Sequence, residues 1–323
     1  IVRPAVDPLA GITERVMVIS DLRLDGANQI APNTAQDDMF GREGDHLLVN
    51  GLKQPVLAVQ PGATERWRIV NATNARYLRL SLAGNAVRVI GHDGGLFEQP
   101  QTVSETLLAP AQRVELIVQA SSTPNQSFAL VAKAYDRGTM MAPSVETRVL
   151  TLSTSLPGAA ATFILPPVLA TVPVMAAPVR TQSIVLSETM MGMVVMGGMG
   201  GMGGMGSTAG MTGTFLINGR SFDMTRTDLV TRAGETEDWL INNQGSMDHP
   251  FHIHGTQFQL IGSTRSDTTP RPGYRAWIDT INVRSGEIVR IRICQTMIGK
   301  RMFHCHILEH EDQGMMGMLD VRA

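Results

Sequence analysis

Six of the eight histidines in this chain fall in two short strings, and the second string also holds a cysteine and methionines. The string DHPFHIHG contains His249, His252 and His254, and the string FHCHILEHEDQGMMGM contains His304, Cys305, His306, His310 and Met315. Imidazole, thiolate and thioether groups all bind transition metals, and the soft sulfur donors favour copper. The clustering therefore predicts a metal site.

The His-Cys-His triplet around Cys305 would divide its ligands between two sites if it lies on an extended segment. Side chains alternate between the two faces of a strand, so the cysteine points one way and its two histidine neighbours point the other. Two further imidazoles can join the cysteine, His310 once the chain turns and His249 from a neighbouring strand. With Met315 as a weak axial thioether, these groups are the ligand set of a blue copper electron-transfer site.

The histidines on the opposite face would form a second site. His304 and His306 would meet His252 and His254, which also share one strand face. This second site would be joined to the first through Cys305 and its neighbouring peptide bonds. The alternatives are zinc or a chance cluster. A structural zinc site has four ligands, whereas seven histidine and cysteine candidates stand in the two strings.

These strings resemble a known copper signature. HPFHIHG followed by HCHILEHEDQGMM is similar to the C-terminal copper motif of the multicopper oxidases, the laccase-like group, and most of all to bacterial laccases and copper-efflux oxidases. The passages VNGLKQPVLAVQPGATERWRIVNATNARYLRL and IGHDGG resemble the middle domain of the same family. The resemblance implies a cupredoxin-like fold. It also implies type 1 copper at His249, Cys305, His310 and Met315, a type 2 ligand at His252, and type 3 ligands at His254, His304 and His306.

Length and composition limit the other possibilities. A chain of 323 residues has room for two ordinary domains. Its net charge of −2 implies no basic face for nucleic acid, and no apolar run approaches membrane-spanning length. The chain starts at Ile1 with no signal sequence, so we expect a processed, trimmed or partial chain. We also expect the protein to be periplasmic or secreted. Beyond Cys305 only Cys294 remains, so no disulfide framework is expected.

Short alternating or β-branched runs predict an all-β protein with two cupredoxin-like Greek-key β-barrel or sandwich domains. The runs cover residues 15–19, 65–70, 76–82, 113–118 and 288–293, with turn residues such as Asn50-Gly51 and Asn218-Gly219 between runs. Two passages around Trp67 and Trp239 also match each other. Each has a hydrophobic strand, Asn-Gly, a spacer, a glycine, a charged residue, tryptophan and a further strand, which indicates two copies of one β fold.

The expected domain order follows from composition and ligand positions. Residues 1–155 would be the middle domain, without copper ligands, because it holds only His46 and His92. His92, in GHDGG, is better explained as a turn or hydrogen-bonding histidine than as a ligand. Residues 156–180, rich in Pro and Ala, would be a linker. Residues 181–323 would be the C-terminal domain, with the type 1 site and half of the ligands for a trinuclear cluster.

Residues 190–211 hold eight methionines among glycines. Glycine-rich chain does not hold a stable helix alone. Thioethers suit Cu(I), and a loop has no core for these side chains to fill, so we favour copper binding. The alternative is a low-complexity loop without a specific role. The resemblance adds that copper-efflux oxidases have a methionine-rich insert in the same part of the last domain.

Two carboxylates near the ligands are candidate catalytic residues. Glu311 follows His310 directly and would either relay protons or orient a ligating histidine. Asp248 precedes His249, where it would bind an oxidisable metal ion or a phenolic donor, or would have no role. We interpret Trp277 and Asp279, on a predicted strand, as structural residues.

The predicted function is a copper-dependent oxidase. It would couple one-electron oxidation of phenols, aromatic amines or Cu(I) to the four-electron reduction of dioxygen to water, and the methionine-rich segment favours a copper-tolerance role. The family builds its three-copper cluster from eight histidines, half of them in an N-terminal domain. We therefore expect a partner N-terminal cupredoxin domain, on the same precursor or a separate chain, and an incomplete oxygen-reducing cluster here. The alternative is a non-catalytic copper-binding or electron-transfer protein. A two-domain nitrite reductase is less compatible, because the first domain lacks a ligand pair.

Overall fold

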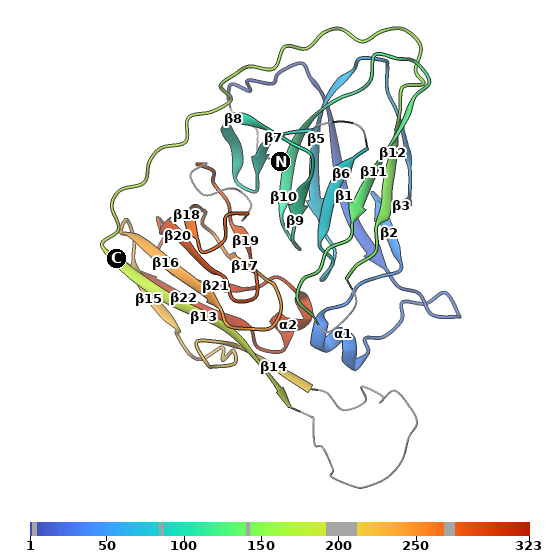
Figure 1. Cartoon of the computed structure of the whole chain (residues 1–323). Helices are drawn as coiled ribbons and strands as arrows, with labels where there is room; N and C mark the ends of the chain where they lie inside the picture. Colours follow the sequence, from blue (N-terminus) through green and yellow to red (C-terminus); the bar gives the residue numbers. More distant parts are fainter. Residues whose placement is uncertain (2–4, 84, 86, 140–142, 192–211, 268–274) are drawn as a thin grey trace.

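Four β-sheets make up most of the molecule, arranged as two sandwiches side by side (Figure 1). The computed structural model describes the chain except residues 2–4, 84, 86, 140–142, 192–211 and 268–274. The all-β, cupredoxin-like fold predicted from the sequence is confirmed. Within the described part, no helix is long and apolar enough to cross a membrane.

The first sandwich contains strands β1 to β12. One sheet has the order β3-β2-β1-β5-β10-β7-β8 and the other β4-β12-β11-β6-β9. The strands are β1 (Thr13–Leu22), β2 (His46–Val49), β3 (Leu52–Lys53), β4 (Val56–Ala58), β5 (Thr64–Asn71), β6 (Leu78–Leu82), β7 (Val87–His92), β8 (Gly95–Val103), β9 (Thr106–Leu108), β10 (Arg113–Gln119), β11 (Ser127–Lys133) and β12 (Thr147–Ser153).

The second sandwich contains strands β13 to β22. Its sheets have the orders β14-β13-β16-β20-β18 and β15-β22-β21-β17-β19. The strands are β13 (Arg180–Met191), β14 (Thr212–Ile217), β15 (Leu229–Arg232), β16 (Thr236–Asn243), β17 (His249–Ile253), β18 (Phe258–Ser263), β19 (Thr280–Val283), β20 (Ile288–Cys294), β21 (Gly299–Cys305) and β22 (Met316–Arg322). The second of these sheets carries both histidine strings.

The sequence repeat is also a structural repeat. β1 pairs with β5 in parallel, and β13 pairs with β16 in the same way. The indole nitrogen of Trp67 donates a 2.9 Å hydrogen bond to the carboxylate of Glu65. In the second sandwich the indole of Trp239 donates an equally long bond to Glu237. Both tryptophans are fully buried, so each copy places the same polar pair inside its core.

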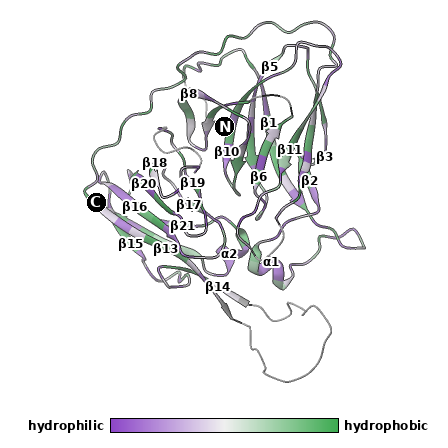
Figure 2. Ribbon diagram, in the orientation of Figure 1, coloured by the Kyte–Doolittle hydropathy of each residue, from purple (hydrophilic) through white to green (hydrophobic). Residues whose placement is uncertain are grey.

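The hydrophobic alternation of the strands places the core. Along β22, every second residue is buried, as expected when one face packs inside and the other faces solvent. Figure 2 shows this alternation as green and purple bands along the strands. One apolar cluster contains both Trp67 and Trp239, so the two sandwiches pack against each other through a shared hydrophobic core.

Two short helices lie where the sandwiches meet (Figure 1). Helix α1 (Ala35–Phe40) starts with a capping box between Thr34 and Asp37. Helix α2 (Leu308–Asp312) follows β21, and Gln313 behind it donates a 2.6 Å hydrogen bond to the carbonyl of Asp38. Neither helix is expected from the sequence pattern, which shows no long helical period. Residues 154–179, between β12 and β13, contain no strand and run along the outside of the molecule (Figure 1).

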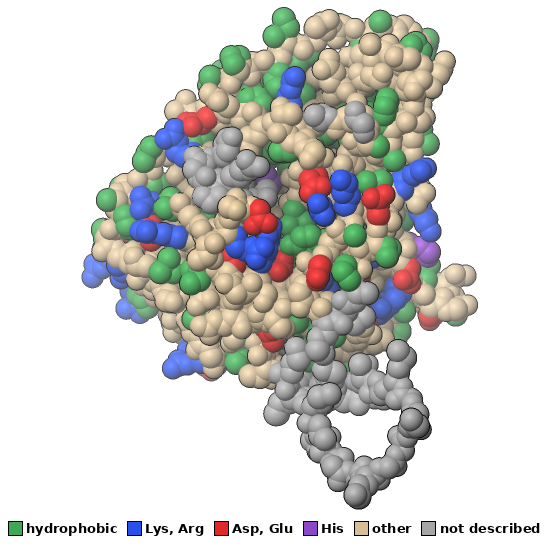
Figure 3. Space-filling model, in the orientation of Figure 1, with side chains coloured by type: hydrophobic (Ala, Val, Ile, Leu, Met, Phe, Trp, Pro, Cys, Tyr) green, Lys and Arg blue, Asp and Glu red, His purple; other side chains and the backbone are tan. Residues whose placement is uncertain are grey.

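Charged side chains of both signs are interspersed on the face shown in Figure 3. Where the sandwiches meet, Arg79 pairs with Glu105 at 2.6 Å and Arg284 pairs with Asp267 at 2.5 Å. This mixture fits the nearly balanced net charge of −2.

Candidate metal centre

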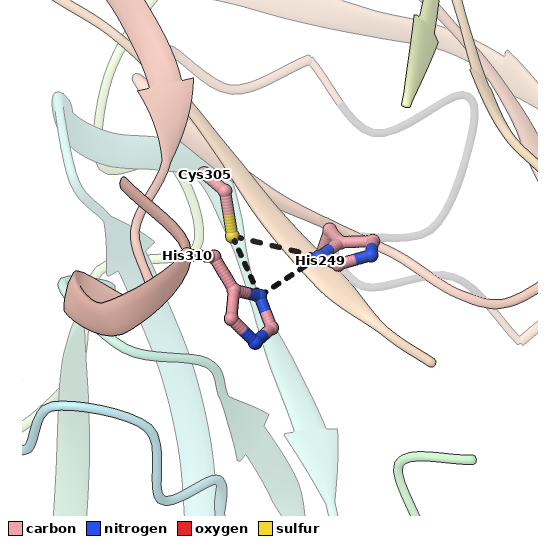
Figure 4. A group of neighbouring side chains, drawn as sticks. All are labelled: His249, Cys305 and His310. Carbon is pink, nitrogen blue, oxygen red and sulfur yellow. Dashed lines mark hydrogen bonds between the residues drawn. The ribbon is translucent and has the colours of Figure 1, made fainter. Parts of the chain in front are cut away.

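The structure brings Cys305, His249 and His310 together in a closed triangle (Figure 4). The cysteine Sγ lies 3.6 Å from Nδ1 of His249 and 3.8 Å from Nδ1 of His310, and the two Nδ1 atoms are 3.3 Å apart. All three residues are completely buried. The three atoms therefore point at one enclosed volume, as predicted.

Two strands and one turn produce this convergence. β17 pairs antiparallel with β21, which places Phe251 opposite Cys305 and carries His249 past the cysteine. After β21 the chain turns into α2 and returns His310 toward the strand it has left. The buried Met315 donates its amide to the carbonyl of His310 at 2.9 Å, and its own carbonyl accepts from the amide of Cys305 at 3.0 Å. The backbone thus holds the predicted axial ligand beside the triangle.

Burial disfavours the charged forms of Cys305 and His310. Burial raises the pKa of the Cys305 thiol far above its ordinary value. Burial also lowers the pKa of His310 well below its ordinary value, and the nearby charge of His249 adds to this effect. A metal ion reverses this situation, because a coordinated thiol loses its proton. Two imidazoles and one thiolate are a soft donor set that suits copper, so these residues fit the ion.

A second group of histidines lies on the other face of β21. Among its members, Nε2 of His254 lies 3.0 Å from Nε2 of His304. His252 is opposite His304 in the β17–β21 register and completes a group whose ligand atoms lie within 4.8 Å of one another. The ring of His306 is 5.3 Å from that of His304 and 5.5 Å from that of His252. The alternation predicted around Cys305 therefore holds.

His254 and His306 of the second group are held neutral, and the group is partly open. Burial, with the charges of neighbouring histidines, lowers the pKa of His306 to about 4. The same causes lower the pKa of His254. Neutral imidazoles are the form that binds metal. His252, His254 and His306 are half-buried rather than enclosed, so this group faces outward, unlike the triangle.

Asp279 is a residue whose role the sequence interpretation missed. Its carbonyl lies 2.9 Å from Nδ1 of His252, its Oδ1 is 3.6 Å from the same atom, and its carboxylate accepts from Arg113 of the first sandwich at 2.7 Å. Burial would raise the pKa of Asp279, but these partners lower it. The sequence pattern places Trp277 and Asp279 on a strand as structural residues, but the strand begins at Thr280. Before it, the carbonyl of Trp277 accepts a 2.9 Å hydrogen bond from the amide of Gly94 in the first sandwich.

Glu311 contacts the second group. Its Oε2 is 3.2 Å from Nδ1 of His304, which also lies 2.9 Å from the carbonyl of Cys305. Burial would raise the pKa of Glu311, but the hydrogen bond and charge of His304 lower it, so the carboxylate is ionised. This contact suits an orienting partner of a ligating histidine. The proton relay considered for Glu311 stays a prediction.

The carboxylate of Asp248 is buried and accepts several hydrogen bonds. The hydroxyl of Tyr135 bonds to its Oδ2 at 2.7 Å, and Nδ2 of Asn282 bonds to the same oxygen at 2.9 Å. The amide of Ser285 reaches Oδ1 at 3.3 Å. Burial raises the pKa of Asp248. These contacts join the two sandwiches next to His249, whereas the donor-binding role considered for Asp248 stays a prediction.

Glu188, near the end of β13, is a second neighbour that the sequence interpretation missed. Its Oε2 lies 3.4 Å from Nε2 of His249, on the side of the ring away from Cys305. Its Oε1 accepts from Oγ of Ser246 at 2.7 Å. Burial would raise the pKa of Glu188, but His249 and Ser246 lower it. Nothing in the local sequence signals this contact, because Glu188 and His249 are far apart in sequence and meet only in the folded chain.

The methionine-rich segment of residues 190–211 falls almost entirely outside the described residues. The structure gives the points where the segment leaves and returns, at Met191 on β13 and Thr212 on β14. Glu188 stands near the first of these points. The copper-binding role considered for the segment therefore stays a prediction.

Comparisons with known proteins give one consistent family. Two sequence profiles, each described as Multicopper oxidase, match residues 16–155 and 202–323. The solved structure entitled "Multicopper oxidase from Campylobacter jejuni: a metallo-oxidase" superposes with a TM-score of 0.86 and 39% identity, covering 99% of this chain and 66% of that one.

Curated relatives bear several names. Multicopper oxidase mco of Staphylococcus haemolyticus is 30% identical, covering 88% of this chain and 54% of its own length. The laccase of Bacillus subtilis is 30% identical, with 86% and 54% coverage. Cell division protein FtsP of Xenorhabdus nematophila is 29% identical, with 96% and 61% coverage. The chain thus spans about half the length of the first curated relatives it matches.

Proposed function

The chain belongs to the multicopper oxidase family, and on that premise we propose that it carries the electron-accepting half of an oxidase that reduces dioxygen. Copper is the cofactor that the family and the donor sets imply. Bound copper would supply one-electron transfer at the first site and oxygen reduction at the second. The observation that carries the proposal is that the two ligand groups lie back to back on β21, at adjacent residues Cys305 and His304.

Each group of residues would have a separate task. His249, Cys305, His310 and Met315 would hold the type 1 copper, and their burial would exclude water from it. His252 would hold type 2 copper, and His254, His304 and His306 would hold type 3 coppers. Asp279 and Glu311 would fix the orientation of His252 and His304, because a hydrogen bond to one ring nitrogen sets which nitrogen remains for the metal.

The donor would approach on the side of His249 that faces away from Cys305, where Glu188 lies. Glu188 places a carboxylate against Nε2 of that ring, and the methionine-rich segment starts from the same strand. A carboxylate, together with the thioethers that residues 190–211 supply in sequence, suits a cuprous ion better than a neutral phenol. We therefore propose Cu(I) as the preferred donor, with phenols or aromatic amines as secondary donors.

The second candidate is a non-catalytic copper protein. It is favoured by the relatives named cell division protein FtsP and by the outward-facing histidine group, which supplies only four imidazoles. Against it, four clustered histidines on the far face of β21 have no use in electron transfer alone. We propose that a further domain of the complete enzyme supplies the remaining ligands of the cluster.

Copper counting and oxygen uptake distinguish these candidates. The full chain would be loaded with Cu²⁺, its copper counted, and its oxygen consumption followed with cuprous and phenolic donors. We expect a blue type 1 signal and little oxygen uptake from this chain alone. Adding the N-terminal cupredoxin domain of a relative should restore uptake. Blue copper with no uptake in any combination would favour the non-catalytic protein, and four coppers with full turnover by this chain would contradict the need for a further domain.

A further inference from the structure

Arg137 belongs to the first sandwich, which holds no proposed ligand, yet it reaches the metal triangle. The residue follows β11 and is only 8% exposed. Its carbonyl accepts a 2.8 Å hydrogen bond from the amide of Asp248, the residue before His249. The backbone of Arg137 is thus attached directly to the strand that carries a ligand.

The guanidinium of Arg137 lies near Ile307, the second residue after Cys305. A Cβ atom placed on Gly41 would stand 3.6 Å from NH1 of Arg137 and 2.6 Å from Cγ2 of Ile307, so both side chains border the same small space. The amide of Ile307 in turn donates to Sγ of Cys305 at 3.4 Å. Ile307 therefore lies near the arginine with its side chain and contacts the thiol with its amide.

The positive charge of Arg137 is poorly compensated. In the described part of the chain, its NH1 is buried without a hydrogen-bond partner. Its ion pair with Glu43 is long, 3.6 Å from Nε, and the same carboxylate also lies 3.4 Å from Arg76. Arg76 has a nearer acidic partner in Asp21, at 3.0 Å, whereas Glu43 is the acidic partner of Arg137 among the described residues. A buried charge with incomplete pairing is costly for folding, and its field extends to its neighbours.

We propose that Arg137 is a positioning residue that raises the reduction potential of the copper held by His249, Cys305 and His310. Reduction removes one positive charge from the site, so a fixed cation nearby favours the reduced form. The effect is strong because the interior has a low dielectric constant and dissolved salt screens buried charges weakly. This inference rests on the proposed type 1 site. It gives the first sandwich, which contains no proposed copper ligand, a part in electron transfer.

Redox titration of the Cu²⁺-loaded full chain tests the inference. Arg137→Gln should lower the equilibrium constant for reduction by a mediator about tenfold, which is about 59 mV for a one-electron couple. Arg137→Lys keeps the charge, so its reduction potential should stay close to that of the unsubstituted chain. Arg148→Gln is the control, because Arg148 is an exposed arginine on β12 of the same sandwich. The reduction potential of this variant should equal that of the unsubstituted chain.

A second variant, expected to shift the potential in the opposite direction, keeps the test valid if Arg137→Gln misfolds. Glu43→Gln removes the carboxylate that partly compensates Arg137 and should raise the potential. An unchanged blue absorption and spin-resonance spectrum in each variant shows that the ligands have not moved. If the unsubstituted chain gives no blue site, the proposed function fails and the inference with it. If the blue site forms but neither Arg137→Gln nor Glu43→Gln shifts the potential, only the inference is overturned.

Discussion

The hydroxyl of Tyr135 donates a 2.7 Å hydrogen bond to Oδ2 of Asp248 across the junction between the two sandwiches. Behind it, the ring of Tyr77 stacks on Tyr135 with centroids 5.3 Å apart, and its own hydroxyl donates to Asn282 at 2.9 Å. Asp248 directly precedes His249. The junction and the proposed type 1 site therefore share one hydrogen-bonded network, and loosening the first should disturb the second.

Removing either tyrosine hydroxyl tests that network. Tyr135→Phe takes a donor from a buried carboxylate and should lower the free energy of unfolding by about 1–3 kcal/mol. Tyr77→Phe removes a bond to a neutral amide and should lower it by about 1 kcal/mol. Urea unfolding of the metal-free chain measures both. Equal, negligible losses would contradict an important role for the Tyr135–Asp248 contact.

Glu188 should discriminate between donors. Replacing it by Gln removes the negative charge beside His249 while keeping its shape. We expect the blue band to be bleached by cuprous ions about tenfold more slowly in Glu188→Gln, since about 1.4 kcal/mol of attraction is lost. Bleaching by hydroquinone should change far less. Stopped-flow absorption with both donors measures this, and equal slowing for the two donors would refute a metal-ion preference at this edge.

The buried His92 should make stability depend on pH. Burial lowers its folded-state pKa from 6.5 to about 4. Between these values the unfolded chain binds a proton that the folded chain does not, so stability is complete above pH 6.5 and falls as the pH drops toward 4. The loss should reach about 3 kcal/mol at pH 4. Urea unfolding of the metal-free chain at several pH values measures it.

His92→Asn isolates this contribution from the other titrating groups. The variant should lose stability at neutral pH and show a shallower decline of the unfolding free energy between pH 6.5 and 4. A decline as steep as that of the unsubstituted chain would show that His92 is not the group responsible.

Asp279 should control metal binding at the second histidine group. Asp279→Asn weakens the pair with Arg113 and the support of His252, so copper affinity at that group should fall about 10- to 100-fold. The blue site on the opposite face of β21 should keep its spectrum. Competition titrations with a copper chelator measure the affinity. Loss of both sites together would mean that Asp279 acts on the whole fold instead of on His252.

The strands and the ligand groups could be predicted because they depend on local pattern. Side-chain alternation around Cys305 separated the two metal groups correctly, and the Trp67–Trp239 match revealed the repeat. Asp279, Glu188 and Arg137 could not be found in this way. Each acts on a ligand from a distant part of the chain, and their neighbours in sequence carry no motif, so only the packed structure brings them to the site.

Copper loading of the two single-cysteine variants is the most direct test of the central claim. The chain has two cysteines, Cys294 at the end of β20 and Cys305 in the triangle. Cys294→Ser should keep the intense blue absorption and narrow copper hyperfine splitting of a thiolate-bound type 1 site, while Cys305→Ser should lose both and still bind copper at the second histidine group. A blue site that survives Cys305→Ser, or no blue site in the unsubstituted chain, would contradict the account.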